Sequence, residues 1–306
     1  MDTRRAFVLN LDADLELASG VGYAPTLRVK EAMRPHVTTL ARSLLRDGDV
    51  LVDDDSPPGS AVSSGNAPLP GLAFCPTPRA LSLLRRAGAE PVAHPSFDVL
   101  RRVNGRAFAA ALGPTLVGAA FFTELDGALA HLCMRPELSS SWRVKRAFGM
   151  AGRGQRVLAV GAIGAADRGF VDASIGRDGG VQIEPNVRIV TELALHGALT
   201  VDGALCAGAV VVQRCDAQGA WLATEPLPAD DPARVHEPAL REELARVAAA
   251  LAAASYFGPF GIDAFVYEGP DRRPRLQPRS EVNARYSMGW PIGMRGIGEP
   301  SWCMRM

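Results

Sequence analysis

The chain has 306 residues, enough to bury a sizeable core, and its 33 Lys and Arg residues balance 33 Asp and Glu residues. This even charge, without a basic stripe, argues against a nucleic-acid-binding surface. No apolar run is long enough to span a bilayer, no secretory signal opens the sequence, and the five cysteines form no CxxC pair. We therefore expect a cytoplasmic protein with reduced thiols and neither a membrane nor a nucleic-acid partner.

Strands and helices alternate in the first hundred or so residues. Apolar segments predict three strands, at 6–11, 49–54 and 71–75. A helix is predicted after the third strand, with Thr77 as its N-cap, Pro78 in its first turn and Gly88 beyond its end. The stretch 55–71 is rich in glycine, serine and proline, which predicts a loop. This alternation predicts a small α/β lobe.

The rest of the chain predicts an α+β region with an antiparallel sheet. A helical pattern covers 96–133, and a second helix with an alanine-rich face covers 237–258. Short segments of strand character, several of them separated by glycine-containing turns, are predicted at 142–148, 181–187, 191–200, 204–215, 221–227, 260–269 and 275–286.

The segment RVKRAFGMAGRGQRVL combines a lysine with a glycine-rich turn. Lys145 is one of only two lysines in the chain, and it precedes Gly149, Gly152 and Gly154. Glycines leave backbone N–H groups open to phosphate oxygens, and a strand lysine can hold the same phosphates as a point charge. The GK[ST] of a Walker loop is missing. A flexible turn beside a solvated lysine is the alternative interpretation.

Two carboxylates and an amide are predicted to share one face of a C-terminal hairpin. If the segments around the turn GPDRRP pair with their centre near Arg272, Asp263 lies opposite Glu281, and Asn283 shares the face of Glu281. Because like charges opposed across strands are destabilising, this pairing predicts a bound cation. A set of oxygen ligands suits Mg²⁺ better than zinc. The alternative is a bulge at Pro278 that shifts the register and turns the acids to solvent.

Other conspicuous residues have structural explanations. Glu184 lies in an otherwise apolar strand and needs a partner, which a ligand or an arginine such as Arg188 could supply. Glu192 opens the next strand. Cys75 precedes a helix, but the end of an apolar strand explains it better than a nucleophile does. We also expect structural roles for three histidines without a nearby nucleophile in sequence, at positions 94, 131 and 196.

Taken in order, these features resemble the ATP-grasp superfamily. The segment EVNARYSMG is similar to its E-[IV]-N-x-R magnesium-binding signature, and RAFGMAGRGQRV resembles its flexible phosphate loop. The resemblance implies an ATP-grasp fold, α/β followed by α+β. It divides the chain into a pre-ATP-grasp lobe at 1–115, a central lobe with the glycine-rich flap at 116–185 and a C-terminal lobe with the antiparallel sheet and the magnesium site at 186–306.

The resemblance also implies how the nucleotide would be held. Lys145 would contact the phosphates of ATP and act in catalysis, and the three glycines of the flap would close over them. Glu184 would accept a hydrogen bond from the adenine amino group, and the backbone at Val187 would continue the hinge between the lobes. Glu192 would hold the ribose.

Metal and phosphoryl contacts follow from the same resemblance. Asp263, Glu281 and Asn283 would carry the Mg²⁺ ions, and Arg285 would steady the transferring phosphoryl group or an acyl-phosphate. Many members have a second phosphate-binding lysine earlier in the chain. Arg106 stands in the comparable place here, and it would hold phosphate as a planar fork rather than as a point charge.

The resemblance implies an ATP- and Mg²⁺-dependent ligase. It would join a small-molecule carboxylate to an amine, with amino acids among the candidates, through an acyl-phosphate, and release ADP and phosphate. Two alternatives stay open: a phosphotransferase acting on a hydroxyl, and a nucleotide-binding protein without turnover. The substrates are not indicated by the sequence, and a homodimer is one option for the assembly.

Overall fold

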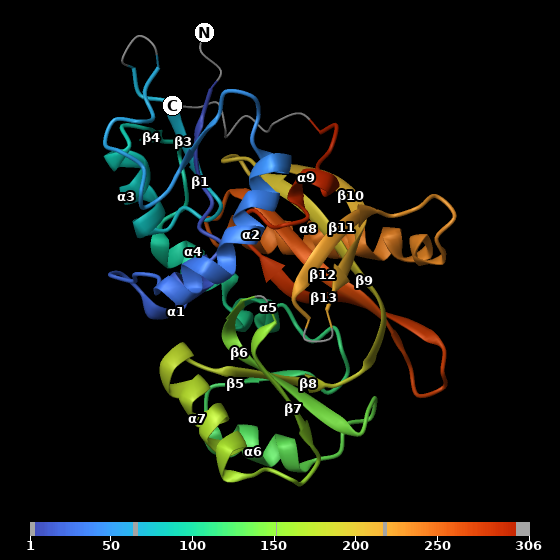
Figure 1. Cartoon of the computed structure of the whole chain (residues 1–306). Coiled ribbons are helices and arrows are strands. Elements are labelled where there is room, and N and C mark those ends of the chain that lie inside the picture. Colours follow the sequence, from blue (N-terminus) through green and yellow to red (C-terminus); the bar gives the residue numbers. More distant parts are fainter. Residues whose placement is uncertain (1–3, 64–66, 151, 217–218, 298–306) are drawn as a thin grey trace.

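Three sheets organise the computed structural model, which describes residues 4–63, 67–150, 152–216 and 219–297 (Figure 1). Their strand orders are β2-β1-β3-β4, β5-β8-β6-β7 and β11-β10-β9-β12-β13. The predicted succession of an α/β lobe and an α+β region is confirmed. Each sheet falls within one of the three predicted segments, although the boundaries of those segments stay a prediction.

The N-terminal part is a parallel sheet with helices packed on it. β1 (Ala6–Val8) lies between β2 (Val50–Val52) and β3 (Pro70–Ala73), and β4 (Glu90–Pro91) pairs with β3. β1 is buried along its whole length, as expected for a parallel strand covered on both faces. The helices of this part are α1 (Ala13–Ser19), α2 (Leu27–Leu44), α3 (Pro78–Arg86), α4 (Phe97–Asn104) and α5 (Arg106–Ala111).

The strands predicted here are confirmed in position but are shorter than expected. Residues 64–66 of the predicted loop lie outside the described residues, and the last two residues of that loop belong to β3.

Thr77 is the N-cap residue of α3, as predicted, but the side chain that caps the helix is that of Glu16. The Thr77 side chain makes no bond to the α3 backbone, and its hydroxyl instead donates to Glu16 Oε2 at 2.6 Å. The backbone N–H of Arg79 donates to Glu16 Oε1 at 2.9 Å. This carboxylate satisfies an orphan N–H and complements the positive end of the helix. Burial raises the pKa of Glu16.

The central part is an antiparallel sheet with its own core. The glycine-rich hairpin is formed by β6 (Ser141–Met150) and β7 (Arg153–Ala159), and β6 also pairs with β8 (Val181–Pro185), which pairs with β5 (Ala120–Phe122). Helices α6 (Leu125–Cys133) and α7 (Ala165–Asp178) pack on the sheet.

One secondary-structure prediction for the central part was wrong, and one helix of this part was not predicted. Strand β5 interrupts the region 96–133 that was expected to be helical. Helix α7 was not predicted, because its buried positions Val171, Ser174 and Asp178 give no apolar stripe.

The C-terminal part is the predicted antiparallel sheet. β9 (Arg188–Leu199) is central, with β10 (Leu205–Cys215) and β11 (Trp221–Pro226) on one side and β12 (Gly258–Glu268) and β13 (Pro274–Asn283) on the other. Helix α8 (Glu237–Ala253) packs on this sheet, and the short α9 (Trp290–Gly293) follows β13.

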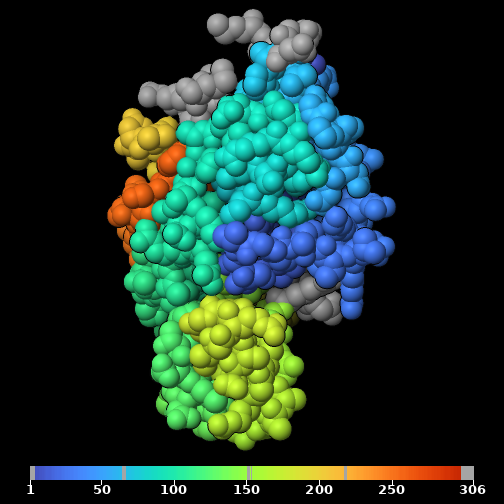
Figure 2. Space-filling view, turned by 90° about the vertical axis from the view of Figure 1, so that its left-hand side faces the viewer, coloured from blue at the N-terminus to red at the C-terminus, as the bar shows by residue number. Residues whose placement is uncertain are grey.

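The N-terminal and C-terminal parts share one hydrophobic core. Phe7 and Leu17 belong to the same buried cluster as Leu244 of α8 and Phe260 of β12. The central part has a separate cluster around Trp142, and Figure 2 shows it projecting from the rest of the molecule. Between residues 4 and 297, no described helix is long and apolar enough to cross a membrane.

Candidate functional site

Every candidate site residue named from the sequence lines one cavity of about 560 Å³. Its volume falls in the range of ligand pockets, roughly 300–1,000 Å³. Side chains from all three parts of the chain line it, among them Asp14 of α1, Glu184 of β8 and Asp263 of β12. The twelve candidates that line it are Arg106, Lys145, Gly149, Gly152, Gly154, Glu184, Val187, Glu192, Asp263, Glu281, Asn283 and Arg285.

Lys145 and Glu184 form an ion pair inside the cavity. Lys145 Nζ lies 2.5 Å from Glu184 Oε1, and the two side chains are 13% and 6% exposed. The pair is diagonal across β6 and β8, since Glu184 lies directly opposite Arg143. The alternative of a solvated lysine was therefore wrong. Arg188 is not the partner of Glu184, because it pairs with Glu268 at 2.7 Å.

Two of the three flap glycines adopt backbone conformations that other residues avoid. Gly152 and Gly154 have φ of +72° and +79°, in the left-handed region that favours glycine. A Cβ at Gly154 would lie 3.2 Å from the side chain of Arg146. Arg146 is held in turn by Asp178 at the end of α7, at 2.5 Å. These contacts fix the Arg146 side chain near the turn end of the hairpin, and β6 also packs against α1.

The predicted pairing of Asp263 with Glu281 is confirmed, but the register of the hairpin that produces it differs from the prediction. Glu268 pairs with Pro274 and Phe265 with Gln277, so the hairpin is centred on position 271 rather than 272. Between the pairs 265–277 and 263–281, one strand advances by two residues and the other by four. A bulge at Pro278 therefore forms, as the alternative supposed. Its two extra residues bring the carboxylates together on the cavity wall.

Hydrogen bonds fix each member of the acidic pair. Asp263 accepts from Gln213 Nε2 at 2.8 Å and from Asn283 Nδ2 at 2.9 Å. Glu281 accepts from Arg106 Nη2 at 2.9 Å. Burial and then the charge of Glu281 raise the pKa of Asp263 to about 6. A cation would relieve this repulsion, and the amide oxygen of Asn283 would add a third oxygen ligand.

A metal ion at this site would have few ligands from the protein. Within the described part of the chain, no three His, Cys, Asp or Glu side chains converge on one point. Two carboxylates and an amide suit Mg²⁺, because this ion usually keeps water and takes substrate phosphates as further ligands. The residues present therefore fit Mg²⁺ held jointly by the protein and a nucleotide, and not a metal held by the protein alone.

Replacing Asp263 with Asn is expected to stabilise the metal-free protein at neutral pH. The folded state holds the Asp263 proton up to about pH 6, whereas the ordinary pKa is 3.8. This stabilising contribution is complete below pH 3.8 and is lost as the pH rises through 6. The Asn variant does not lose this contribution as the pH rises. Its free energy of unfolding should therefore exceed that of the wild-type protein by roughly 2–3 kcal/mol above pH 7 and by close to zero near pH 4.

Denaturant unfolding with a chelator present, at pH 5 and pH 8, measures this difference. The matched control is Asp271→Asn in the exposed turn of the same hairpin, which should show no such gain. A loss of stability in Asp263→Asn at pH 8 would contradict the prediction.

Arg279 clamps the bulge that places Glu281. Its Nε donates to Glu243 Oε1 at 2.6 Å, and its other nitrogens donate to the carbonyls of Ala109 and Gly113. Its own carbonyl accepts from Thr115 Oγ1 at 2.8 Å. The clamp thus ties the bulge to α8 and to the end of α5. Bulges next to functional sites commonly aim a side chain in this way.

If the cavity binds ATP with Mg²⁺, as the resemblance implies, replacing Arg279 with Ala is expected to raise the Mg²⁺ concentration needed for half-maximal ATP binding about tenfold, because Glu281 loses its fixed register. The matched control is Arg246→Ala. Arg246 also binds Glu243, at 2.7 Å, but its described hydrogen bonds reach only Glu243 and the carbonyl of Leu112. Calorimetric titrations over a range of Mg²⁺ concentrations measure the effect. Equal Mg²⁺ requirements in the two variants would contradict a positioning role.

Arg285 is held by a residue that sequence reasoning missed. Its Nη2 and Nε donate to Asp14 at 2.7 and 3.2 Å, and its guanidinium lies 5.2 Å from the centre of the Phe74 ring. Burial disfavours the charge, yet Asp14 and Glu281 hold the pKa of Arg285 above its ordinary value. The pair is separated by 271 residues, so no local pattern reveals it. The alternating acids of LDADLEL were the available signal.

Two further lining residues were missed. Gln213 fixes Asp263, as described above. Arg143 donates to Gln155 Oε1 at 3.1 Å and to Asn186 Oδ1 at 2.8 Å, joining the flap to the hinge that follows β8. Arg143 precedes Lys145 by two residues on the same strand face, which is a signal that the sequence offers.

Arg106 has an unused donor in the cavity wall. Its Nη1 donates to the carbonyl of Arg146 at 2.7 Å and its Nη2 to Glu281. Its Nε is buried and has no hydrogen-bond partner among the described residues. Buried N–H groups are rarely left unpaired, so this atom indicates a ligand acceptor. A phosphate oxygen suits a guanidinium.

Cys75 and His196 lie in the core. Cys75 is fully buried, and burial raises the pKa of its thiol, which argues against a nucleophile. Burial also lowers the pKa of His196 to about 4, and a Cβ on Gly293 would lie 2.4 Å from its Nδ1. The imidazole therefore packs directly under α9 as a neutral ring.

Solved structures share the fold of this chain, although no protein-family model and no curated protein matches its sequence. D-alanyl-alanine synthetase A from Vibrio cholerae is 16% identical, with 97% of this chain and 92% of that chain covered and a TM-score of 0.53. Biotin carboxylase from Campylobacter jejuni, in an ATP complex, is 12% identical, with 98% and 69% covered and a TM-score of 0.55. D-alanine–D-alanine ligase from Helicobacter pylori is 14% identical, with 92% and 91% covered and a TM-score of 0.50.

These three proteins are ATP-grasp enzymes. At sequence identities this low, the similarity shows a shared fold and nothing about function. The chain therefore has the ATP-grasp fold that its motifs predict.

Proposed function

We propose that the protein is an ATP- and Mg²⁺-dependent ligase that joins a small-molecule carboxylate to an amine. The observation that carries the proposal is that a buried lysine, an opposed carboxylate pair and the glycines of a hairpin all line one cavity. The Vibrio and Helicobacter proteins are named for joining alanine units, and the Campylobacter structure is named as an ATP complex. Those names support the reaction class by analogy of fold.

The nucleotide would lie between the central and C-terminal sheets. Glu184 would exchange part of its interaction with Lys145 for the adenine amino group, and Glu192 would receive the ribose hydroxyls. Lys145 and the unused Nε of Arg106 would hold the phosphates under the flap. Asp263, Glu281 and Asn283 would hold Mg²⁺, which neutralises charge on the β- and γ-phosphates when bound.

The reaction would proceed in two displacements. A carboxylate oxygen of the substrate attacks the γ-phosphorus, the bond from that phosphorus to the β,γ-bridging oxygen breaks, and ADP leaves. The amine nitrogen then attacks the acyl carbon, the bond from that carbon to the phosphate-bearing oxygen breaks, and the nitrogen loses a proton. Arg285, held in place by Asp14, would balance negative charge at the reacting centre. The protein contributes orientation and electrostatics, and no covalent nucleophile is needed.

Isotope transfer tests this function. With a carboxylate labelled with ¹⁸O, ATP and an amine, the released phosphate should carry one ¹⁸O atom, and ADP and amide should form in equal amounts. Phosphate retained on an organic product would indicate a phosphotransferase instead, and nucleotide binding without any ADP would indicate a binding protein. The cytoplasmic location, the lack of nucleic-acid and membrane partners and the option of a homodimer stay predictions.

A further inference from the structure

The cavity extends beyond the proposed nucleotide site to a region that we call the acceptor end. N-terminal elements and the segment after β13 supply its walls. Tyr286 N donates to the carbonyl of Phe74 at 3.0 Å, which fastens that segment to the end of β3. The residues that define the acceptor end are Leu11, Asp14, Met33, Phe74, Arg285 and Met288.

The six residues that define the acceptor end include one charged pair, which is neutral overall, and the neighbouring lining residues His36 and Ser287 add an imidazole and a hydroxyl group. Asp14 and one edge of the Arg285 guanidinium are joined by two hydrogen bonds, and Arg285 Nη1 donates to the carbonyl of Tyr286. A guanidinium has five N–H groups, so one remains on each terminal nitrogen, enough for a single carboxylate. Asp14 keeps lone pairs that can accept from an ammonium group.

Charge at the acceptor end is too low for a phosphorylated substrate. Among the lining residues that the structure describes, three other side chains are permanently cationic, namely Arg106, Arg143 and Lys145. Arg106 and Lys145 belong to the proposed nucleotide site, and Arg143 is engaged by Gln155 and Asn186. A phosphate carries nearly two negative charges and would meet the carboxylate of Asp14 beside its only guanidinium.

The remaining walls of the acceptor end are apolar and rigid. Leu11, Met33 and Phe74 are buried members of the core shared by the N-terminal and C-terminal parts, and Met288 packs against that core. Thioether and aromatic side chains offer a large apolar contact area to a ligand. Because these side chains are fixed by the core, the wall is preformed rather than assembled by a ligand.

We propose that the carboxylate substrate has an apolar body, a single carboxylate directed at Arg285 and no phosphate group. Apolar α-amino acids fall within this class, since Asp14 can receive their ammonium group. The inference rests on the proposed function for the role of the carboxylate. It goes further by excluding phosphorylated and dicarboxylate substrates from the same site.

Calorimetric titrations with Mg²⁺ and the non-hydrolysable analogue AMP-PNP test the proposal. Leucine, phenylalanine and 4-methylpentanoate serve as apolar probes, and glutamate and O-phosphoserine as charged ones. At least one apolar probe should bind ten or more times tighter than either charged probe. Met288→Lys should weaken that apolar probe at least fivefold and favour the charged probes. The matched control Met134→Lys, at a position 55% exposed and outside the cavity, should change neither.

The outcomes separate the two claims. Tighter binding of glutamate or O-phosphoserine, no binding of any apolar probe, or equal behaviour of Met288→Lys and Met134→Lys would overturn this inference while AMP-PNP still binds. Failure of AMP-PNP to bind the wild-type protein would overturn the proposed function, and this inference with it.

Discussion

Replacing Glu281 with Gln is expected to lower ATP-dependent phosphate release about 10²–10³-fold while the fold survives. The carboxylate pair loses one of its two charges, so Mg²⁺ bridging the phosphates loses a strong ligand. Gln keeps the shape of the side chain and can still accept from Arg106 Nη2, which lies 2.9 Å from Glu281 Oε1. Relief of the like-charge contact with Asp263 should leave the free energy of unfolding unchanged or slightly higher.

A matched variant on the same hairpin controls for the loss of a glutamate. Glu268 lies at the far end of β12, where it pairs with Arg188 on the surface. Glu268→Gln should therefore release phosphate at the wild-type rate. Phosphate release and thermal unfolding should be measured on both variants with the same substrates. Wild-type turnover in a cleanly folded Glu281→Gln preparation would contradict the assignment of this residue to the metal site.

Replacing Lys145 with Gln is expected to raise the Kd for ATP about 10- to 100-fold, the effect of losing a charge-assisted contact to phosphate. The substitution should also destabilise the protein, because the Glu184 side chain is only 6% exposed and loses its cationic partner. Breaking a buried pair from one side destabilises a protein by a few kcal/mol. The double variant Lys145→Gln, Glu184→Gln should recover most of that stability but not the affinity.

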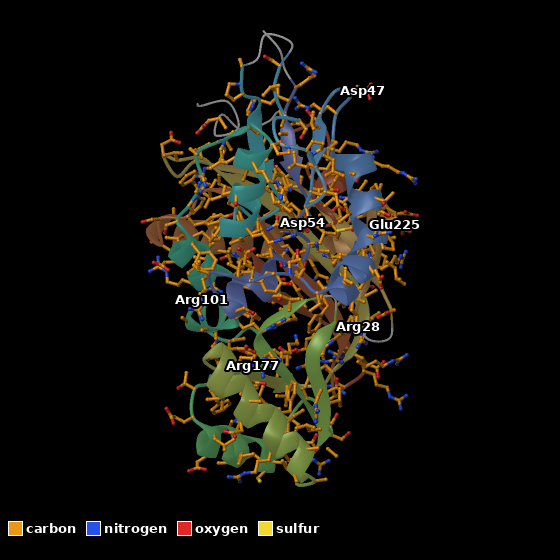
Figure 3. The ribbon with its side chains drawn as sticks, turned by 60° about the vertical axis from the view of Figure 1, so that its left-hand side comes forward. Arg28, Asp47, Asp54, Arg101, Arg177 and Glu225 are labelled. Carbon is orange, nitrogen blue, oxygen red and sulfur yellow. The ribbon has the colours of Figure 1, made fainter. Side chains whose placement is uncertain are left out.

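The other lysine of the chain supplies the control. Lys30 pairs with Asp54 at 2.7 Å, and Asp54 keeps Arg79 as a second partner. Asp54, labelled in Figure 3, belongs to the N-terminal part and does not line the cavity. Lys30→Gln should leave both ATP affinity and stability nearly unchanged. Full recovery of affinity in the double variant would show that Lys145 acts only by neutralising Glu184.

Local patterns gave the fold class and the candidate residues, because both depend on short-range periodicity and spacing. Strand alternation placed β9 to β13, and the turn GPDRRP pointed to the hairpin that carries Asp263 and Glu281. The pairing of those two residues was predicted correctly, but the prediction did not include the bulge that produces it. The turn is centred one position earlier than expected, and the bulge at Pro278 makes up the difference. A bulge is stabilised by distant groups, here the contacts of Arg279.

Contacts between distant segments could not be predicted. The cap of α3 comes from Glu16, 61 residues before Thr77, and the partner of Arg285 is 271 residues away. Lys145 and Glu184 were each noticed, but nothing local indicates that they meet. Helix α7 was not predicted because its buried face includes Ser174 and Asp178, whose burial depends on the elements packed against the helix. Each failure reflects tertiary structure overriding local preference.

Titration calorimetry of ATP with Mg²⁺ and with a chelator, on the wild-type protein and on Glu281→Gln, tests the central claim most directly. The claim is that Lys145 and the pair Asp263–Glu281 form two sides of one MgATP site. We expect Mg²⁺ to tighten ATP binding to the wild-type protein at least tenfold and to have little effect on the variant. Equal ATP affinity with and without Mg²⁺ in the wild-type protein, or no binding in either condition, would contradict it.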